Sequence, residues 1–290
     1  ENLFSPVVPP EGHIPGVAVW YATVCRECPA GCGAMVRVRE GRALKAEGNP
    51  FHPINRGRLC AQGQASLQGL YNPDRIREPL RRNPAGSFQP IKWEEAEEFL
   101  AENLDAIRGR GMGNQIVFIS PLLTGSLDRL IADWLKALGS QRLLRYEPLS
   151  YEPIRAANRI CFDRDVVPTH HLAEAKLILS FGADFLEGWI SPVEFAQGFS
   201  KMRRPDNGRM GRFIYIGPRL SLTAANADEW ISPKPGTELL LALSMVHVIL
   251  AEGLAASLSQ DEREEIRVLA RAYDPKTVAA RTEVPAEQIV

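Results

Sequence analysis

Four of the five cysteines stand at a spacing that could hold a metal centre. Cys25, Cys28 and Cys32 lie within eight residues, and Cys60 follows after 27 further residues. A thiolate is a nucleophile, a redox group and a soft metal ligand. The pattern C-x2-C-x3-C-x27-C leaves three interpretations open: a disulfide framework, a structural zinc site and an iron–sulfur cluster.

The spacing favours the cluster over the other two interpretations. Disulfide frameworks are typical of small, cysteine-dense domains, whereas this chain has 5 cysteines in 290 residues. Structural zinc usually takes two close pairs of ligands rather than a triplet and a distant single cysteine. A cubane cluster needs one thiolate for each iron, so three close cysteines can wrap one side while a fourth caps the other.

The residues around the cysteines suit an anionic cluster. Pro29, Gly31 and Gly33 would let the backbone curl, so that its N–H groups point at sulfur. Three arginines lie near these cysteines in the sequence: Arg26, Arg56 and Arg58. They would stabilise negative charge on the cluster, and the alternative is that they are solvated surface residues.

The segment that must position the cysteines is predicted to be β-rich. Residues 1–20 contain four prolines and are predicted to form an extended arm. Ala34–Glu40 alternates apolar and polar residues as a strand does, and a tight turn leads into a second strand, "ALKAEG". This hairpin would carry Cys60 round to the far side of the site. Residues 61–92, rich in Pro, Arg and Asn, are predicted to form a connector. The predicted iron–sulfur domain together with this connector covers residues 21–92.

Residues 93–290 are predicted to form an α/β domain with a parallel, Rossmann-like sheet, because apolar strands alternate with helices. After an amphipathic helix that begins at Trp93, the candidate strands are Ile116–Ser120, Leu143–Tyr146, Lys176–Phe181 and Arg212–Ile216. The candidate helices are Ser126–Leu138, Tyr151–Cys161, Val193–Met202 and Thr237–Ala251. The tail, residues 261–290, is expected to form short helices, with the architecture incomplete at its end. Cys161 is expected to be a small buried hydrophobe.

Composition excludes some classes of protein. Hydrophobic content is 45% and charged content 24%, as in ordinary globular domains. The apolar run Leu239–Leu250 is too short to span a membrane and is expected to form a buried helix. We expect no signal peptide and no direct membrane span in this sequence.

Charge is unevenly distributed along the chain. Residues 1–92 hold 12 Lys and Arg against 7 Asp and Glu, while residues 93–290 hold 22 against 28. A basic cysteine region agrees with an anionic group bound there, and two ordinary surfaces are the alternative. Nucleic acid is not an expected partner, because no basic stripe is interleaved with aromatic residues.

Two long stretches carry a resemblance to a known family. The cysteine spacing, with "GRALKAEGNPFHPINRGRLCAQGQASLQGLYNPDRI", resembles the N-terminal iron–sulfur domain of the DMSO-reductase (bis-molybdopterin) oxidoreductase family. The stretch "FIYIGPRLSLTAANADEWISPKPGTELLLALSMVHVIL" resembles the next domain of that family. The resemblance covers residues 20–290 and implies one [4Fe-4S] cluster on Cys25, Cys28, Cys32 and Cys60.

The stretch from "SYEPIRAANRICF" to "FGADFLEGWISPVEFAQGF" is similar to one branch of the family. This branch is formed by the large iron–sulfur subunits of alternative complex III and of menaquinone reductase complexes, which have lost the molybdenum cofactor. The resemblance implies an electron-transfer and scaffold subunit of a membrane-associated, quinone-linked respiratory complex, with no substrate chemistry in this chain. The implied partners are other iron–sulfur subunits, haem c subunits and integral membrane subunits, on the periplasmic or outer face of a bacterial inner membrane.

Two departures from the family argue against bound molybdopterin. Active members hold the metal by a Ser, Cys, selenocysteine or Asp in the loop after the second strand of the α/β domain. Here that region offers only Ser150 and Cys161, and neither has a glycine-rich context. Members that pass electrons from cluster to pterin often carry Lys or Arg two residues after the fourth cysteine, where this chain has Gln62. We therefore expect no molybdopterin and no catalytic residue.

Two alternatives remain open at this point. The chain could be the N-terminal part of a catalytic molybdenum or tungsten bis-pterin enzyme of the polysulfide-reductase kind. It could also be a structural relic with an empty or zinc-filled cysteine site. Molybdenum and iron contents would separate these alternatives.

Three further features invite a functional interpretation. Pro121–Leu123 and Asp184–Ile190 are candidate docking surfaces for partner subunits, or else strand-end loops covered by the next helix. His170 and His171 could bind a metal, but no cysteine or acidic pair stands at ligand spacing. They are expected to mark a junction between a loop and a helix.

Overall fold

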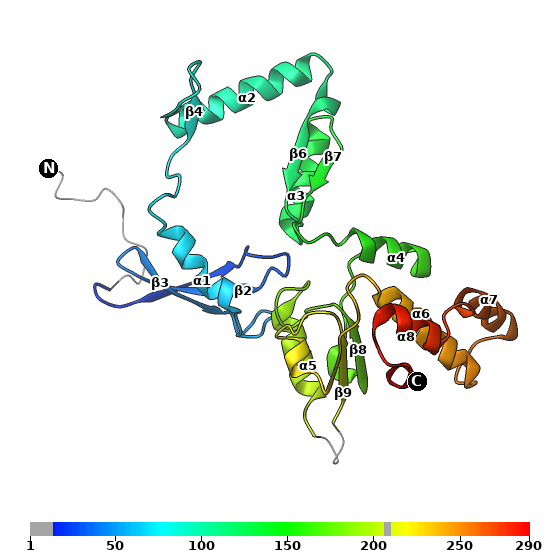
Figure 1. Ribbon diagram of the computed structural model, residues 1–290. Helices are drawn as coiled ribbons and strands as arrows, with labels where there is room; N and C mark the ends of the chain where they lie inside the picture. The colour runs from blue at the N-terminus through cyan, green and yellow to red at the C-terminus, as the bar shows by residue number, and fades with distance from the viewer. Residues whose placement is uncertain (1–13, 206–209) are drawn as a thin grey trace. The chain divides into compact units, whose positions relative to one another are not determined.

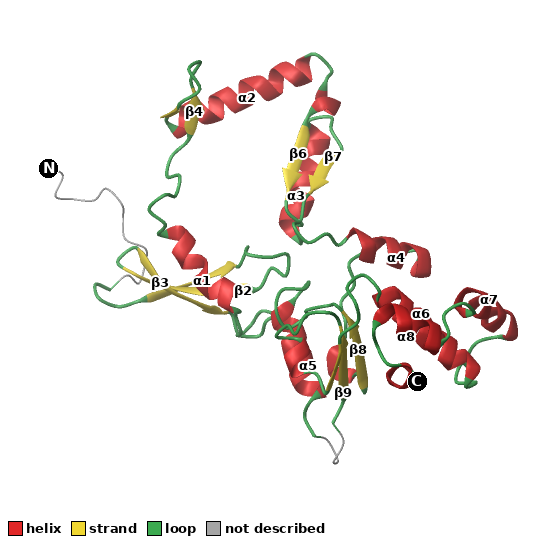
Figure 2. Ribbon diagram, viewed as in Figure 1, coloured by secondary structure: helices red, strands yellow, loops and turns green. Residues whose placement is uncertain are grey.

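The computed structural model describes residues 14–205 and 210–290. It divides into two compact units, with the boundary between Thr169 and His170. Figure 1 traces the chain through them, and Figure 2 separates helices from strands. Most of the predicted arm, residues 1–20, lies outside the described residues, and strand β1 already begins at Val19. The predicted domain boundary at residue 93 stays a prediction.

The first unit begins with a three-stranded antiparallel sheet in the order β1-β2-β3. Its strands are β1 (Val19–Val24), β2 (Gly33–Arg39) and β3 (Arg42–Gly48). Glu40 and Gly41 join β2 to β3 with φ of 49° and 77°, as a two-residue hairpin turn of the primed type requires. The predicted hairpin between the third and fourth cysteines is therefore confirmed.

Residues 61–92 are more ordered than the predicted connector. They contain helix α1 (Ala61–Leu70) and a short hairpin of β4 (Leu80–Arg82) and β5 (Phe88–Pro90). The sequence of α1, AQGQASLQGL, has too few apolar residues for helical periodicity to reveal it. Instead, a cap at its first turn and packing on β3 hold the helix (Figure 1).

The rest of the first unit follows the predicted α/β order. Helix α2 (Trp93–Gly109) is followed by the short 3-10 helix η1 (Gly113–Gln115) and a parallel pair of strands. The strands are β6 (Val117–Ser120) and β7 (Arg142–Arg145), and the helices that follow them are α3 (Ser126–Ala137) and α4 (Glu152–Phe162). At no end do these bounds differ from the predicted ones by more than one residue.

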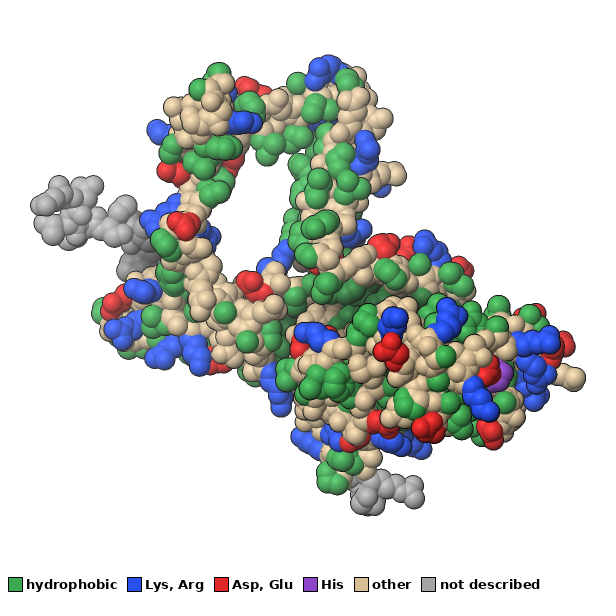
Figure 3. Space-filling view, viewed as in Figure 1, with side chains coloured by type: hydrophobic (Ala, Val, Ile, Leu, Met, Phe, Trp, Pro, Cys, Tyr) green, Lys and Arg blue, Asp and Glu red, His purple; other side chains and the backbone are tan. Residues whose placement is uncertain are grey.

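Helix α3 covers one face of the β6–β7 pair. Phe118 on β6 meets Trp134 on α3 edge to face, with ring centroids 6.0 Å apart. On the opposite face Ile119 and Leu144 stay 69% and 55% exposed. Figure 3 shows hydrophobic side chains along this part of the chain. Parallel strands are normally buried on both faces. The described chain leaves this face of the β6–β7 pair uncovered.

The second unit is built on a three-stranded parallel sheet in the order β10-β9-β8. Strands β8 (Leu177–Phe181) and β9 (Arg212–Ile216) match the predicted ones, and the 3-10 helix η2 (Leu172–Glu174) precedes β8. The third strand, β10 (Glu229–Ile231), was not predicted, because three residues that begin with a charged side chain carry no strand pattern. The α/β class with a parallel sheet is confirmed.

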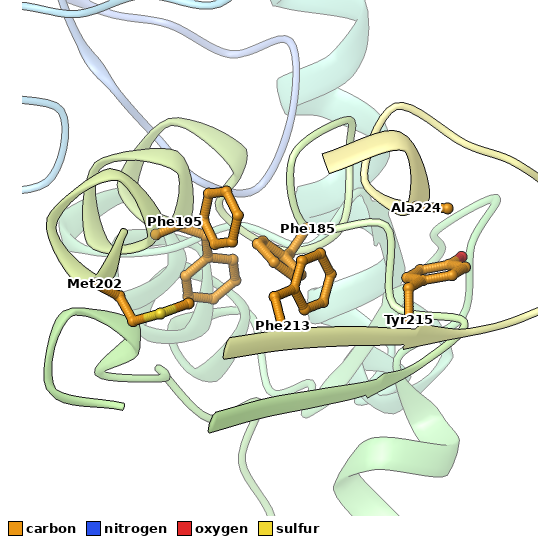
Figure 4. Packing of buried hydrophobic residues seen from close by; sticks show 7 residues of the cluster. Phe185, Phe195, Met202, Phe213, Tyr215 and Ala224 are labelled. Carbon is orange, nitrogen blue, oxygen red and sulfur yellow. The ribbon is translucent and has the colours of Figure 1, made fainter. Parts of the chain in front are cut away.

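An aromatic cluster packs helix α5 (Pro192–Met202) on this sheet (Figure 4). Phe185, Phe195 and Phe213 are at most 3% exposed. The centroids of the Phe185 and Phe213 rings lie 5.3 Å apart. Trp189 and Ile190 pack against the same cluster. Of the two alternatives for Asp184–Ile190, this packing supports the covered strand-end loop and not the docking surface, because its apolar side chains belong to the core of this unit.

Polar side chains join the loops that follow β8 and β9. The Asp184 carboxylate accepts hydrogen bonds from Tyr215 (2.8 Å), Ser221 and Arg219 (2.7 Å). Arg219 also donates to Glu187 (2.8 Å). Burial by itself would raise the pKa of Asp184, but these hydrogen bonds outweigh it and lower the pKa. The network closes the carboxyl end of the sheet, with the 3-10 helix η3 (Ala224–Asn226) just beyond it.

Four helices complete the second unit: α6 (Glu238–Ala251), α7 (Gln260–Ala270), α8 (Pro275–Thr282) and α9 (Ala286–Ile289). Leu241 on α6, Val278 on α8 and Ile289 on α9 share a second core cluster with Ile216 of β9. The helix predicted over Leu239–Leu250 is present, but it is only partly buried: Leu241 and Ser244 are fully buried, whereas Leu239 is 68% exposed. Within residues 14–205 and 210–290, no helix has the length and apolar content needed to span a membrane.

We expect Gly48→Ala to destabilise the first sheet. A Cβ at position 48 would stand 2.4 Å from the carbonyl oxygen of Arg58, which is backbone and cannot swing aside. Overpacking of this kind lowers the free energy of unfolding by about 1–3 kcal/mol. The measurement is the midpoint of urea unfolding.

Gly69→Ala is the matched control for that substitution. Gly69 lies in α1, and nothing stands within 4 Å of the Cβ it would gain. Replacing glycine in a helix stabilises by about 0.5–1 kcal/mol. Equal midpoints for the two variants would show that the close approach at Gly48 does not limit stability.

Candidate metal centre

The first three cysteines lie in the loop that joins β1 to β2. Val24 pairs with Gly33 at the end of the ladder, so Cys25 and Cys32 stand at the base of the loop. The backbone N–H of Cys25 donates to the carbonyl of Cys32 (2.8 Å). Cys28 lies between them along the loop, and Gly31 has φ of 60°, where glycine avoids the steric penalty of a side chain. The loop therefore brings three thiols to one end of the sheet.

The side-chain amide of Asn55 joins this loop to the segment that leads to Cys60. Its Oδ1 accepts from the N–H of Gly33 (2.9 Å), and its Nδ2 donates to the carbonyls of Gly33 (2.8 Å) and Arg58 (2.6 Å). Asn55 is fully buried. A primary amide has both donors and an acceptor, which these three contacts require. Asn55 thus fixes Arg58, two residues before Cys60, against the residue that follows Cys32.

Close backbone approach strengthens this junction. The N–H of Asn49 donates to the carbonyl of Gly33 (2.9 Å). A Cβ at Gly33 would stand 2.6 Å from His52. Gly33 has no positive φ, so it is needed for space beside His52 and not for the backbone curl predicted from the sequence. The prediction for Gly31 agrees with its left-handed backbone.

Cys60 is the N-cap residue of α1. Its Sγ accepts from the N–H of Gly63 at 3.5 Å. A Cβ on Gly63 would lie 3.3 Å from the Sγ of Cys25, so the thiols of Cys25 and Cys60 both stand beside the first turn. A helix N-terminus favours negative charge and stabilises a thiolate there.

The four thiols are close enough to repel one another when ionised. The pKa of the Cys32 thiol is raised to about 11, first by burial and then by the charges that Cys28, Cys25 and Cys60 would carry. Burial is also the main cause that raises the pKa of Cys25 and of Cys28, and Cys60 adds to both. A positively charged metal group would remove this repulsion, since thiolate ligands are deprotonated when they bind metal.

Backbone N–H groups face two of these sulfurs. The N–H of Glu27 hydrogen-bonds to the thiolate of Cys25, and the N–H of Ala30 to that of Cys28, which in each case lowers the pKa against the effect of burial. Donors of this kind surround the sulfurs of iron–sulfur proteins. In the described part of the chain, no three His, Cys, Asp or Glu side chains form a group that could hold a single metal ion. A cubane places each thiolate on a different iron and does not need such convergence.

The arginines expected at the site are exposed. The side chains of Arg26, Arg56 and Arg58 reach solvent, and Nε of Arg56 donates to the carbonyl of Pro53 (3.2 Å). It is the backbone carbonyl of Arg58 that takes part in the junction with Asn55. Stabilisation of cluster charge by these three arginines stays a prediction.

The other candidate residues lie away from the four thiols or are held in other roles. Ser150 accepts from the N–H of Glu152 (3.2 Å) just before α4. Gln62 is exposed on α1. Cys161 is exposed on α4, so the prediction of a buried cysteine is wrong. The amphipathic pattern of α4 places it on the face that nothing in the described unit covers.

His170 and His171 precede the 3-10 helix η2, as a loop-to-helix junction would. The His170 ring stacks on Trp189 with centroids 5.5 Å apart, and burial lowers its pKa. His170 therefore packs as an aromatic side chain against the core of the second unit.

Sequence reasoning missed Asn55 and Gly63, the residues that connect the cysteines to one another. Asn55 lies in "HPINRGRLC", where a polar residue five positions before Cys60 gives no signal of its burial. Gly63 could have been found from the spacing Cys60-Ala61-Gln62-Gly63, because an N-cap side chain accepts from the third residue of its helix.

Comparison with known proteins agrees with this geometry. The family model for the Fe4S4 domain of molybdopterin oxidoreductases matches residues 18–72, which include all four cysteines. The model for molybdopterin oxidoreductase matches residues 75–277. The chain belongs to the molybdopterin oxidoreductase family, as the motifs predicted, and carries its Fe4S4 domain.

The relatives place the chain within this family. It is 31% identical to the menaquinone reductase molybdopterin-binding-like subunit of Nitratidesulfovibrio vulgaris, over 96% of this chain and 39% of that protein. It is 30% identical to the arsenate respiratory reductase molybdopterin-containing subunit of a Shewanella species, over 82% of this chain and 28% of that protein. The chain thus spans less than half the length of these relatives.

A solved structure supports the fold. Acetylene hydratase from Pelobacter acetylenicus superposes with a TM-score of 0.70 at 21% identity, over 92% of this chain and 37% of that one. The prediction that the chain holds no molybdopterin receives no support from these matches, because the molybdopterin oxidoreductase model covers most of the α/β region.

We expect Asn55→Ala to loosen the metal centre. Removing the amide leaves the N–H and carbonyl of Gly33 and the carbonyl of Arg58 without this partner, and a buried polar group left unsatisfied costs about 1–3 kcal/mol. The four cysteines should then lose bound iron several times faster in the presence of an iron chelator. The measurement is the rate at which the visible absorbance of the cluster decays.

Asn49→Ala is the matched control, since among the described residues the Asn49 side chain accepts from the exposed N–H of Phe51 (3.0 Å) and takes no part in the contacts of Asn55. Its decay rate should stay near that of the parent. If both variants lost iron at the parent's rate, the buried amide would not hold the site together.

Proposed function

We propose that the chain is an electron-transfer and scaffold subunit of a membrane-associated, quinone-linked respiratory oxidoreductase. One [4Fe-4S] cluster on Cys25, Cys28, Cys32 and Cys60 would accept and donate single electrons. The observation that carries this proposal is the gathering of these four thiols, close enough to raise the pKa of Cys32 and with Cys25 and Cys60 beside the first turn of α1, within the region that the Fe4S4 domain model matches. We propose residues 21–92 as the cluster domain with its connector and residues 93–290 as the α/β domain.

The residues of this chain would bind and shield the cluster. The N-terminus of α1 and the N–H groups of Glu27 and Ala30 would stabilise its thiolates. Asn55 would keep the fourth ligand in register with the first three. Burial of Cys32, at 5% exposure, would exclude water from one side.

Membrane association and partner subunits are proposed from the relatives. A relative matched over 96% of this chain is named as a subunit of a menaquinone reductase. We propose iron–sulfur, haem c and integral membrane subunits as partners, on the periplasmic or outer face of a bacterial inner membrane. Gln62, and a loop around Ser150 without glycine-rich context, favour a chain that works without molybdenum.

A second candidate function is the N-terminal part of a catalytic molybdenum or tungsten bis-pterin enzyme. The match of the molybdopterin oxidoreductase model to residues 75–277 favours it. In that case the cluster would carry electrons between a pterin-bound metal and a partner subunit.

Metal analysis of the intact protein separates the two candidates. The electron-transfer proposal expects about four irons and four sulfides per chain, as one cubane requires, with molybdenum and tungsten at background. The measurement is elemental analysis of the purified complex. Stoichiometric molybdenum or tungsten would favour the catalytic candidate, and absence of iron would contradict both.

Cys60→Ala is expected to abolish the [4Fe-4S] spectrum, because a cubane that loses one of its four thiolates becomes labile. Electron paramagnetic resonance of the reduced protein is the measurement. Cys161→Ala serves as the control, because that thiol is exposed on α4 and should leave the signal unchanged. A full signal in Cys60→Ala would remove Cys60 from the ligand set.

A further inference from the structure

The loop that follows strand β6 lies against the cysteine loop. A Cβ placed on Gly31 would stand 3.5 Å from the hydroxyl oxygen of Thr124. Thr124 is two residues from Leu122, whose backbone N–H donates to the Glu147 carboxylate (2.5 Å). The Glu147 carboxylate, from the loop after β7, is therefore bound to the same short loop that lies against the cysteine loop at Gly31.

The Glu147 side chain lies among charged residues that are paired with other partners. It is half-buried, and it lines a cavity of about 300 Å³ together with Leu122, Arg145 and Arg155. Arg145 is paired with Asp128 (2.7 Å), and Arg155 with Glu152 and Asp165. Among the described residues, Glu147 forms no ion pair that would neutralise its charge. Burial is the main cause that raises the pKa of the Cys28 thiol, and the charge of Glu147 adds to it after those of Cys60 and Cys25.

We propose that Glu147 sets the reduction potential of the cluster by placing a fixed negative charge beside the Cys28 side of the site. This inference rests on the proposed function, because it requires a cluster on the four cysteines. Glu147 is a tuning residue: it binds no iron and takes no part in the transfer of an electron.

The direction of the effect follows from Coulomb's law. Reduction adds one electron to a cluster that already carries negative charge on its ligands. A nearby carboxylate repels the added charge, and partial burial weakens the screening by water. Glu147 therefore disfavours the reduced state, and its neutralisation should make the potential more positive.

Glu147→Gln tests this inference in the intact protein. The glutamine oxygen can still accept from the N–H of Leu122, so the loop should keep its structure. At a solution potential that leaves half of the parent's clusters reduced, the ratio of reduced to oxidised cluster should rise about threefold or more in the variant. The measurement is a redox titration followed by electron paramagnetic resonance, with iron and sulfide determined on the same sample.

Two further variants complete the experiment. Glu147→Ala removes the charge and the hydrogen bond together, and it should shift the titration in the same direction even if Glu147→Gln assembles poorly. Glu102→Gln removes an exposed carboxylate of α2 that is not among the charges acting on Cys25, Cys28 or Cys32, and it should leave the titration unchanged.

The outcomes separate this inference from the function on which it rests. A full cluster with an unshifted potential in both Glu147 variants would overturn the role of Glu147 and leave the proposed function standing. A shift of equal size in Glu102→Gln would also overturn it, because any lost carboxylate would then have the same effect. A parent protein without iron would overturn the proposed function and this inference together.

Discussion

The metal centre depends on one buried amide. The four cysteines proposed as ligands come from two places in the sequence, and the sheet by itself positions only the first three. Asn55 holds both the N–H and the carbonyl of Gly33 and reaches the carbonyl of Arg58, so the backbone beside Cys32 and the backbone before Cys60 share one set of hydrogen bonds. The absence of side chains at Gly33 and Gly48 allows the two segments to lie this close. A short polar contact therefore fixes the position of Cys60 more directly than the hairpin does.

The second unit uses a comparable arrangement. Asp184 joins the loop after β8 to the loop after β9 through Tyr215, Ser221 and Arg219. In both units a side chain with several hydrogen-bonding positions connects loops that the strands leave independent. Fully satisfied polar networks of this kind specify one loop arrangement, since any other would leave buried groups unpaired.

The sequence predicts those elements of this protein that show a regular apolar pattern or a characteristic spacing of residues. Strands such as Arg212–Ile216 and the helix over Leu239–Leu250 carry apolar patterns long enough to recognise, and the cysteine triplet is a spacing by itself. Helix α1 and strand β10 could not be found in this way, because α1 depends on its cap at Cys60 and β10 on pairing with β9. Cys161 was misplaced because residue type predicts burial only on average, and α4 exposes this face. Asn55 and Glu147 act through tertiary contacts that no local pattern encodes.

Cys60 has two partners at once, the N–H of Gly63 within α1 and, in the proposed function, an iron atom. The order of the first helical turn and the occupancy of the site are then thermodynamically linked, so that each stabilises the other. A chain that has not received its metal would have a weaker cap, and its helix would fray from that end. The amide protons of the first turn of α1 would then report cluster maturation, since their exchange with solvent slows only once the fourth ligand is bound.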